Sequence, residues 1–600
     1  MVKAFWRAFR DFTGQLARPS GRAAWRQDFR MLPCALRWAL PWAVLGRVSR
    51  DANPMRWLER HARQRPSDVA LSTAERQWSF VELHAEVQQR ARQLSERGLA
   101  AGSQVAMLLP TEPALVITLL ACWQLGAIAC PLDPASPATQ LTEILERLAP
   151  DWLIVGKAAP NVTWRDERLI RVEQLVEASV AWAASVGRGP TGHVRIAASA
   201  VAMILPTSGT EGSLKLCRVT AGRLALSGHA MGALALDCRR HDVIYCPLPL
   251  QHATGVTVAP LPALVHGVAL YLPGKFSASS FWDELSRSRA TQLIYVGDLL
   301  RVASARWSTE KAPPKGLRRL VGNGLDASAA ALVQERLSSS RIVEFYGATE
   351  APSLLLNYHG RLGAIGRVPW RALSRFVVVR DAADATESSA ARWNECAPGE
   401  VGELWIRIPR GKRPYLGDFE GYLDQRDAQR ALTENALAKG DYYFRTRDLV
   451  RYDADDFFYF IDRLGDVWRS NGHNVSTTWL ATRLREVAGI QDACATAIAI
   501  DDSSRRIGLA VVVTNGSDWR AGYAAAVLEL PTYARPQLVQ VLRELPRTAT
   551  SKTNKTVWRC PLWQPPVDTL ALYVWNDGLI DVSAMDWATL RATLLSGKNA

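Results

Sequence analysis

The chain has 600 residues, enough for more than one domain, and its 48% hydrophobic and 22% charged residues are typical of a globular protein. Nine cysteines without a C-x-x-C pair argue against a disulfide framework or a cysteine-ligated zinc site, and favour a reducing, cytoplasmic compartment. The net charge of +14 suits nucleic acid, anionic lipid or a polyanionic small substrate, and since no nucleic-acid-binding motif is present we expect one of the latter two.

The N-terminal extension, residues 1–50, mixes aromatic side chains with many arginines and few acids. This composition is typical of a basic amphipathic segment that lies on an anionic membrane surface. Residues 1–48 therefore predict a peripheral contact on the cytoplasmic face of a membrane, with packed N-terminal helices as the alternative. A membrane span over 31–48 is disfavoured because two arginines and two prolines interrupt it.

Helix and strand patterns alternate after residue 50. Helical periodicity runs through 53–98, and strand-like runs at 105–109 and 127–132 flank a buried helix at 114–125. Such alternation predicts a layered α/β domain with much parallel sheet. Further along, residues 398–407 show the alternation of a strand hairpin.

A stretch rich in hydroxyls and glycines, residues 204–215, follows an apolar strand-like run at 197–205. Unhindered backbone N–H groups, hydroxyls and one lysine are what a polyphosphate needs. The stretch is not a Walker A loop, because the apolar run 216–219 after the lysine predicts a hairpin and not a helix. The candidate phosphate-binding residues are Thr207, Ser208, Gly209, Thr210, Glu211, Gly212 and Lys215.

Two further stretches end predicted strands with polar turns. Residues 322–325 read Gly-Asn-Gly-Leu after a strand at 317–321, and residues 343–350 read Val-Glu-Phe-Tyr-Gly-Ala-Thr-Glu. Ligands of open α/β sheets bind beyond the carboxyl ends of the strands, where an aromatic ring can stack on a purine and a carboxylate can hold Mg²⁺. The candidates are Gly322, Asn323, Gly324, Tyr346, Gly347 and Thr349 for a nucleotide and Glu350 for Mg²⁺.

The stretch 204–215 resembles the phosphate loop of the adenylate-forming superfamily of acyl-CoA synthetases, peptide-synthetase adenylation domains and luciferases, with Leu214 in the usual proline position. Runs at 243–255, 275–282 and 292–301 narrow the resemblance to the branch of fatty-acid-transport proteins and very-long-chain acyl-CoA synthetases. The resemblance implies ATP-dependent activation of a long-chain fatty acid to acyl-AMP and then to acyl-CoA, with ATP, Mg²⁺ and coenzyme A as cofactors. It also implies that the turn at 322–325 lies against the adenine.

A Thr-Arg-Asp run that ends at Asp448 and an Asp-Arg run that ends at Arg463 resemble two nucleotide-contacting motifs of the superfamily. The resemblance assigns the ribose hydroxyls to Asp448 and a further nucleotide contact to Arg463. Arg447 and Asp456 stand where the family has glycine. If the first glycine serves a positive φ or a close approach, Arg447 adds bulk beside the nucleotide.

The resemblance further implies a large AMP-binding α/β domain over 51–464 and a small, mobile α+β domain over 465–600, with 1–50 outside both. Residues 469–478 resemble the loop that reaches the active site for thioester formation. Because three residues expected there are replaced, the coenzyme A step is less well supported than adenylation. The replacements are Asn471, His473 and Trp479.

Lys552 matches the C-terminal lysine that contacts carboxylate and nucleotide in the family. Fixed positive charge would bring a carboxylate and a triphosphate together, and such preorganised electrostatics is usually the largest catalytic contribution. The expected catalytic residues are Lys552, Glu350, Thr210 and Lys215. Two alternatives stay open: an acyl-AMP ligase that hands the acyl group to a carrier protein, and a non-catalytic lipid-binding or uptake protein on a degenerate synthetase fold.

Overall fold

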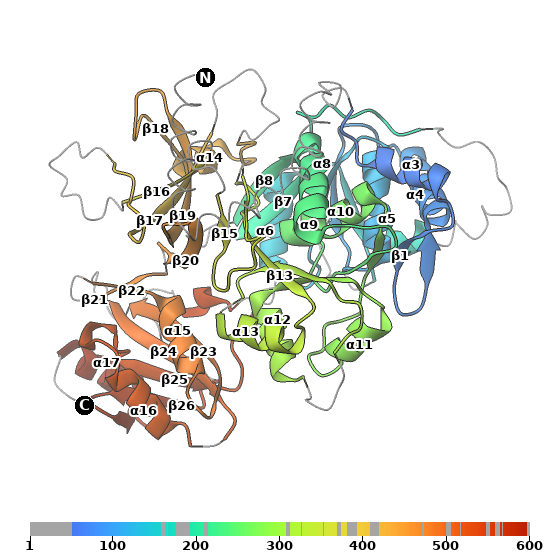
Figure 1. Ribbon diagram of the computed structural model, residues 1–600. Coiled ribbons are helices and arrows are strands. Elements are labelled where there is room, and N and C mark those ends of the chain that lie inside the picture. The colour runs from blue at the N-terminus through green and yellow to red at the C-terminus, as the bar shows by residue number, and fades with distance from the viewer. Residues whose placement is uncertain are drawn as a thin grey trace.

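The computed structural model places most of the chain after residue 50 in three main sheets with flanking helices (Figure 1). The described residues are 51–157, 164, 166–175, 192–208, 214–307, 313–325, 327–351, 353–368, 374–380, 393–408, 419–464, 466–470, 473–499, 506–516, 518–547, 553–558, 564–566 and 568–596. None of the helices in these ranges is long and apolar enough to cross a membrane. The predicted membrane-contacting segment 1–48 lies outside them.

The first sheet is built from runs that are apolar on both faces. Its inner strands are buried throughout and pair in parallel, as expected for strands covered on both sides. The predicted strands at 105–109 and 127–132 are confirmed with shifts of one residue. In spatial order the strands are β6 (Leu169–Arg171), β5 (Trp152–Val155), β3 (Gln104–Leu108), β4 (Ile128–Leu132), β7 (Val201–Ser208) and β8 (Leu214–Thr220).

The second sheet has a parallel half and an antiparallel half that meet at β13. The parallel half consists of the neighbouring strands β13, β12, β11, β9, β10 and β1, and β2 pairs antiparallel with β1 at the edge. The predicted strands before the two polar turns are β12 and β13 of this half. In spatial order the strands are β16 (Phe376–Val379), β17 (Val401–Arg407), β19 (Tyr442–Tyr452), β20 (Phe457–Arg463), β15 (Gly366–Arg367), β14 (Leu355–Leu356), β13 (Arg341–Tyr346), β12 (Arg319–Asn323), β11 (Gln292–Val296), β9 (Val243–Tyr245), β10 (Ala269–Tyr271), β1 (Val69–Ser72) and β2 (Gln77–Ser79), and β18 (Leu432–Glu434) pairs with β19.

The two large sheets share one hydrophobic core through the helices of this region. A single buried cluster contains Leu58, Leu83, Leu119 and Leu224 from helices and Ile244 from the second sheet. The buried helix predicted at 114–125 is confirmed as α5. The helices are α3 (Met55–Gln64), α4 (Phe80–Glu96), α5 (Pro113–Gln124), α6 (Ala138–Leu148), α8 (Ala221–Ala230), the π-helix η3 (Met231–Leu236), α9 (Ala253–Val258), α10 (Pro260–His266), α11 (Phe281–Arg287), α12 (Gly297–Ala305), α13 (Ala327–Arg336) and α14 (Gln425–Ala431), with the 3-10 turn η2 (Asp166–Arg168).

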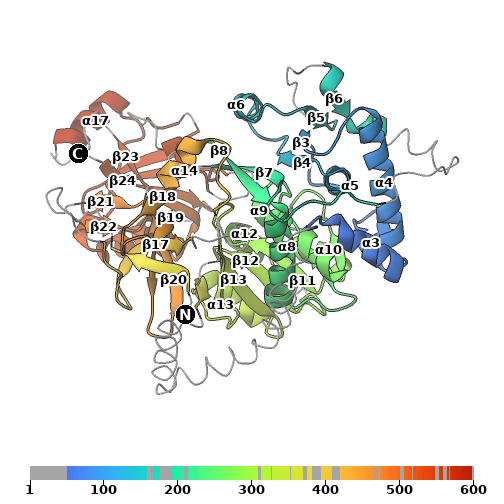
Figure 2. The ribbon, with the colours of Figure 1, turned by 90° about the horizontal axis from the view of Figure 1, so that it is seen from above.

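The C-terminal elements, coloured orange to red, form a smaller group at the lower left of Figure 1 and on the left of Figure 2. Alternate residues of the strand β24 (Arg506–Thr514) face two different hydrophobic clusters. Ala510 and Val512 belong to one cluster, and Leu509 and Val511 belong to the other. With its small sheet and packed helices, this region confirms the mixed α/β class. The elements are the hairpin β21 (Trp468–Ser470) and β22 (His473–Val475), the sheet β23 (Ile490–Ala499), β24 (Arg506–Thr514), β25 (Leu538–Leu542), β26 (Ala571–Trp575) and β27 (Leu579–Asp581), α15 (Thr477–Arg485), α16 (Arg520–Leu528), α17 (Trp587–Ser596), and the 3-10 turns η6 (Thr532–Ala534) and η7 (Lys555–Trp558).

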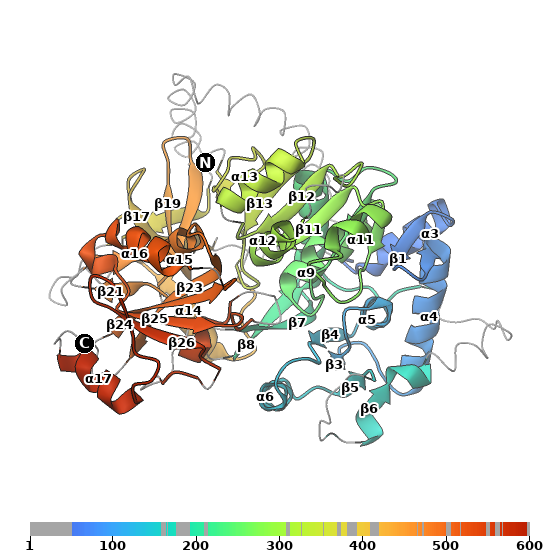
Figure 3. The same ribbon diagram turned by 90° about the horizontal axis from the view of Figure 1, so that it is seen from below.

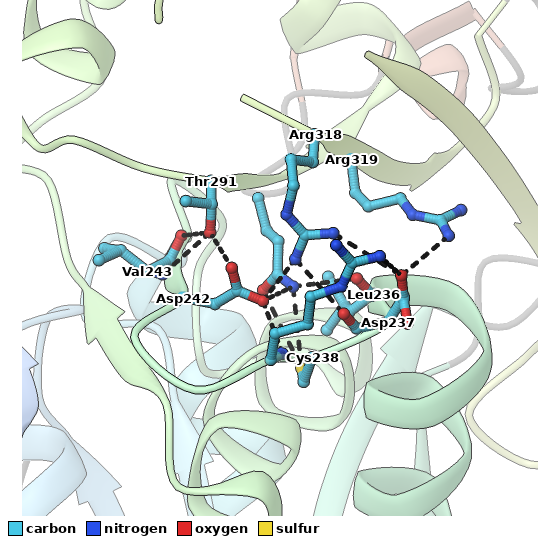
Figure 4. Close-up of polar contacts among 10 residues, drawn as sticks. Leu236, Asp237, Cys238, Asp242, Val243, Thr291, Arg318 and Arg319 are labelled. Carbon is cyan, nitrogen blue, oxygen red and sulfur yellow. Dashed lines mark hydrogen bonds and ion pairs between the residues drawn. The ribbon is translucent and has the colours of Figure 1, made fainter. Parts of the chain in front are cut away.

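A polar cluster ties together the amino ends of three parallel strands, β9, β11 and β12 (Figure 4). Its centre is the buried carboxylate of Asp242, which accepts hydrogen bonds from Thr291 Oγ1 (2.8 Å), Gln292 Nε2 (3.0 Å) and Arg318 Nη2 (2.6 Å). The backbone N–H of Arg239 donates to the same carboxylate at 2.7 Å. The polar turns lie at the opposite, carboxyl ends of the parallel strands, so this cluster has a structural position away from them.

The cysteines in the described part of the chain form no disulfide bonds with one another, and all but one of them are buried. Burial raises the pKa of the Cys122 and Cys246 thiols to about 12. The six buried ones are Cys122, Cys130, Cys217, Cys246, Cys396 and Cys494, and Cys238 is partly exposed.

Candidate functional site

The carboxyl ends of β12 and β13 open onto a cavity of about 2870 Å³, whose walls also include the hairpin β7–β8, the facing ends of β19 and β20, and parts of the C-terminal region. The cavity gathers predicted residues from stretches that are far apart in the sequence. Those that line it are Thr207, Lys215, Asn323, Gly324, Tyr346, Gly347, Thr349, Glu350, Asp448 and Arg463.

Several other predicted residues do not contribute a described side chain to this cavity. Gly322 lies within β12 and packs against β11, where a Cβ atom would stand 2.3 Å from the carbonyl oxygen of Tyr295. Its lack of a side chain is thus explained by strand packing. Ser208 ends β7, and its side chain is outside the described part. Also outside it lie Gly209, Thr210, Glu211, Gly212, Asn471 and Lys552.

The predicted hairpin after the phosphate-loop stretch is confirmed. Strands β7 and β8 pair antiparallel with Thr207 opposite Lys215, so both residues stand near the end of the hairpin at which the two strands are connected. Residues 420–423 run beside β8, since the Arg218 N–H donates to the Gly421 carbonyl (3.2 Å). The Leu423 N–H likewise donates to the Leu216 carbonyl at 2.8 Å.

Glu350 points a carboxylate at this hairpin. Its Oε1 accepts a hydrogen bond from the Tyr422 hydroxyl at 3.0 Å, and Cys217 Sγ lies 3.9 Å from Oε2. Burial and the nearby carboxylate raise the pKa of Tyr422 far above its ordinary value, so the hydroxyl stays protonated as a donor. Lys215 Nζ lies 5.2 Å from the centre of the Tyr422 ring. The arrangement places one carboxylate and one ammonium group against the same aromatic residue.

This geometry fits a magnesium ion that takes one protein carboxylate. Within the described ranges no cation pairs with Glu350, and no group of three or more His, Cys, Asp or Glu side chains is placed to hold a metal. Mg²⁺ commonly binds one or two carboxylates and completes its shell with phosphate and water oxygens. A single carboxylate in this position fits that mode of binding.

Asp448 forms the opposite part of the site. It is buried, and its Oδ2 accepts a hydrogen bond from the Tyr346 hydroxyl at 2.6 Å. Arg463, its register partner on β20, places Nε 3.3 Å from Oδ1. Burial and the Asp448 carboxylate raise the pKa of Tyr346 well above its usual range. Three residues that the sequence singled out independently are therefore in direct contact.

The backbone before Asp448 explains one departure from the family pattern. Arg447 has φ 62°, in the left-handed region, and its N–H donates to Glu403 Oε1 at 3.1 Å. Residues 446–448 stand opposite Leu404 alone, so the strand bulges here. Asp456, the other glycine replacement, also has φ 62°. Both positions keep a positive φ, which glycine adopts more readily than any other residue.

Sequence reasoning missed residues that support these groups. Glu344 is buried in β13 and accepts hydrogen bonds from the Gly324 N–H (2.9 Å) and the Tyr295 hydroxyl, so it fixes the turn at 322–325. The signal that could have indicated this role is a glutamate within the apolar strand that leads to Tyr346. Tyr422 and Arg223 contact the site from segments without any motif, and no pattern in the sequence marked them.

The C-terminal region reaches the cavity as well. Thr553, Asn554 and Lys555 line it, and Lys555 Nζ donates to Thr477 Oγ1 at 2.7 Å. The start of α15 is held by buried Asp462, whose Oδ2 accepts from the Thr477 N–H at 2.6 Å. Lys555 is thereby attached to the start of α15, next to β20.

Residues 58–416 match the family model described as "AMP-binding enzyme". The chain belongs to the AMP-binding enzyme family. Human long-chain fatty acid transport protein 6 is 27% identical to it over 77% of each chain. The medium/long-chain-fatty-acid–CoA ligase FadD6 of Mycobacterium tuberculosis is 28% identical over 82% of this chain and 83% of its own.

Solved structures share the architecture of this AMP-binding enzyme. O-succinylbenzoate coenzyme A synthetase (MenE) from Bacillus subtilis, in complex with ATP and magnesium ion, has a TM-score of 0.68 and 21% identity over 84% of this chain and 98% of that chain. At this identity the likeness shows the fold alone.

Proposed function

We propose that this AMP-binding enzyme is an acid–thiol ligase that converts a long-chain fatty acid, with ATP, to acyl-AMP and then to acyl-CoA. The observation that carries the proposal is the meeting of Thr207, Lys215, Glu350 and the Asp448–Arg463 pair around one cavity. The names of its relatives, a fatty acid–CoA ligase and a fatty acid transport protein, support the choice of substrate.

The chemistry explains why such a site needs fixed positive charge. A carboxylate is a poor acyl donor, so its oxygen attacks the α-phosphorus of ATP, the bond to pyrophosphate breaks, and acyl-AMP forms. Two anions must meet, and one preorganised donor is worth about 3 kcal/mol in such a step. Mg²⁺ on Glu350 would supply charge to the phosphates. In this proposal the 207–215 hairpin and its loop hold the phosphates, and Lys552 steadies the attacking oxygen.

The nucleotide would lie between the two polar turns and Asp448. Tyr346 and Gly347 line the space beside Asn323 and Gly324, so a purine can stack there while Asp448 accepts from the ribose hydroxyls. Arg463 Nε lies 3.3 Å from Asp448 Oδ1 and so helps to orient this acceptor. Thr349 offers a hydroxyl for a phosphate oxygen.

An apolar part of the same cavity supports the proposal that the substrate is a fatty acid. Its apolar side chains come from α8, the π-helix η3 and α9, and the hydroxyls of Ser227, Thr254 and Thr257 on the same helices line the cavity beside them. The apolar residues are Leu226, Ala230, Met231, Leu234 and Val258.

Coenzyme A would accept the acyl group through its thiol, which attacks the mixed anhydride and releases AMP. Trp479, where the branch would have glutamate, lines the cavity and is 43% exposed, so this half of the reaction differs most from the family pattern. Thioester formation with added coenzyme A distinguishes the ligase from an acyl-AMP ligase that serves a carrier protein.

Adenylation can be tested by measuring the rate of pyrophosphate release with fatty acids of graded length. The decisive variant is Lys552→Ala. The variant should lose at least about 100-fold in rate, because one fixed charge at the reacting oxygens is removed. Lys555→Ala, three positions away and bonded to Thr477, is the matched control and should lose far less. A wild-type rate for Lys552→Ala, or no release with any acid by the native protein, would overturn the proposal.

The basic segment 1–48 gives the proposal a location: a cytoplasmic enzyme held peripherally on a membrane, where fatty acids partition. Deletion of this segment should lower sedimentation with anionic liposomes and leave sedimentation with neutral liposomes unchanged. Equal sedimentation of both proteins with anionic liposomes would remove the anchor from the proposal.

A further inference from the structure

Arg223 joins α8 to the turn that carries Thr349 and Glu350. Its side chain is only 19% exposed. Through Nη2 it donates to the carbonyl oxygens of Ala351 (2.5 Å) and Ala348 (3.4 Å). These two carbonyls flank the pair of polar residues, so the guanidinium holds the turn at both ends.

The other arm of the guanidinium faces Glu420. Arg223 Nη1 lies 3.8 Å from Glu420 Oε2, and Glu420 also accepts from the Thr220 N–H (2.9 Å) and hydroxyl (2.5 Å). Thr220 ends β8 and caps α8, with its hydroxyl accepting from the Arg223 N–H. Arg223 therefore connects the phosphate-loop hairpin, the Glu350 turn and the segment that contains Tyr422.

Within the described contacts, the turn itself has one internal hydrogen bond, from the Ala351 N–H to the Ala348 carbonyl at 3.0 Å. Tyr422 orients the Glu350 carboxylate, and Arg223 fixes the backbone that carries it. A rigid, planar fork with several donors can hold two carbonyls and a carboxylate together, whereas an ammonium group on a flexible stem cannot.

We propose that Arg223 is a positioning residue, which sets the Glu350 carboxylate against the phosphate-loop hairpin so that a divalent cation can bridge it to a bound triphosphate. This inference rests on the nucleotide site of the proposed function and deepens it. Partners that orient a metal-binding carboxylate typically contribute about 10- to 100-fold to metal affinity.

The test measures Mn²⁺ binding by electron paramagnetic resonance in the presence of a non-hydrolysable ATP analogue and without fatty acid. Arg223→Met keeps the aliphatic stem but no donor, and we expect Mn²⁺ affinity to fall by about tenfold or more. The Mn²⁺ affinity of Arg223→Lys should lie between that of Arg223→Met and that of the native protein. Glu350→Gln gives the reference for loss of the carboxylate itself.

Arg535→Met is the matched control. Arg535 is 20% exposed, donates to two carbonyls, Leu530 (3.1 Å) and Leu528 (2.9 Å), and lies 3.9 Å from Asp577, but it does not line the cavity. The Arg535→Met variant should have the Mn²⁺ affinity of the native protein, even if its melting temperature is lowered as much as that of Arg223→Met. In pyrophosphate release, Arg223→Met should raise the half-saturating Mg²⁺ concentration more than it lowers the rate at saturating Mg²⁺.

Unchanged Mn²⁺ affinity in Arg223→Met, or an equal fall in Arg535→Met, overturns the inference. Where Arg223→Met does not fold, Arg223→Lys decides by the same measurement, since native affinity in that variant also overturns it. If the native protein binds Mn²⁺ with the nucleotide but releases no pyrophosphate with any acid, the ligase proposal fails while the role of Arg223 stands.

Discussion

At the scale of single residues, Arg447 shows how the chain keeps a glycine-like backbone without glycine. Its φ of 62° places Cβ near the following carbonyl, which costs roughly 1–2 kcal/mol for an L residue. The bulge compensates, because the Arg447 N–H reaches the buried carboxylate of Glu403, which Arg445 also binds at 2.6 Å. The strain lies directly beside Asp448.

Replacing Arg447 by glycine should relieve this strain. We expect Arg447→Gly to raise the free energy of unfolding by about 0.5–1 kcal/mol in urea titrations, after the greater freedom of glycine in the unfolded chain is subtracted. Arg447→Ala, which removes the guanidinium but keeps a Cβ, should give no gain. Equal changes in both variants would assign the effect to the side-chain charge instead of the backbone.

Residue by residue, the sequence predicted the parts of the site that carry chemistry of their own. Asp448, Glu350 and Tyr346 belong to short polar runs after apolar strands, and the structure brings them to one cavity. Arg223 and Tyr422 were not predictable, because their importance comes from contacts with residues 128 and 72 positions away in the sequence. An arginine in a helix and a tyrosine in a loop carry no local signal of such contacts.

At the scale of elements, strands marked by a continuous apolar run were predicted well, and short strands were not. Continuous apolar runs marked β3 and β4, whereas the helical periodicity read over 53–98 is interrupted by the hairpin β1–β2. The alternation predicted for 398–407 is also wrong: the interior of β17 is buried on both faces, since β16 and β19 pair with its edges and hydrophobic clusters cover its two faces. Tertiary neighbours decide such cases.

The cluster at the amino ends of β9, β11 and β12 should be a major source of stability for these elements. Asp242→Ala leaves Arg318 without its buried partner and removes the acceptor of Thr291 and Gln292, so we expect a loss of about 3 kcal/mol in the free energy of unfolding. Arg239→Ala, which removes an exposed ion pair to Asp237, should cost less than about 1 kcal/mol. Similar losses in the two variants would contradict this ranking.

At the scale of the whole molecule, α12 lies beside the C-terminal sheet (Figure 3), and an ion-pair network joins the two. Asp492 on β23 contacts Arg301 of α12 (3.0 Å), Arg547 (2.5 Å) and Arg485 (3.1 Å), and Arg547 reaches Asp298 at 3.5 Å. Together these arginines outweigh the burial that would raise the pKa of Asp492, and hold that pKa below its ordinary value. The domain boundary at 465 and the mobility of the C-terminal region stay predictions.

Removing Arg301 should loosen this contact. We expect Arg301→Gln to weaken it by about 1.4 kcal/mol, and so to speed amide hydrogen exchange in α12 and the start of β23 about tenfold. Arg483→Gln, whose ion pairs with Glu486 and Glu529 are exposed, is the control and should leave this exchange unchanged. Unaltered exchange in Arg301→Gln would show that apolar packing alone holds the two parts together.

The enclosure of the cysteines has a practical consequence for measuring the second half-reaction. Only a thiolate attacks a disulfide dye, and the described thiols are buried or have their pKa raised by burial, so they should react slowly at neutral pH. Consumption of free coenzyme A can therefore be followed colorimetrically against a background to which the described thiols contribute little. Added denaturant, which exposes these sulfurs, would reveal them as a separate, later burst of colour.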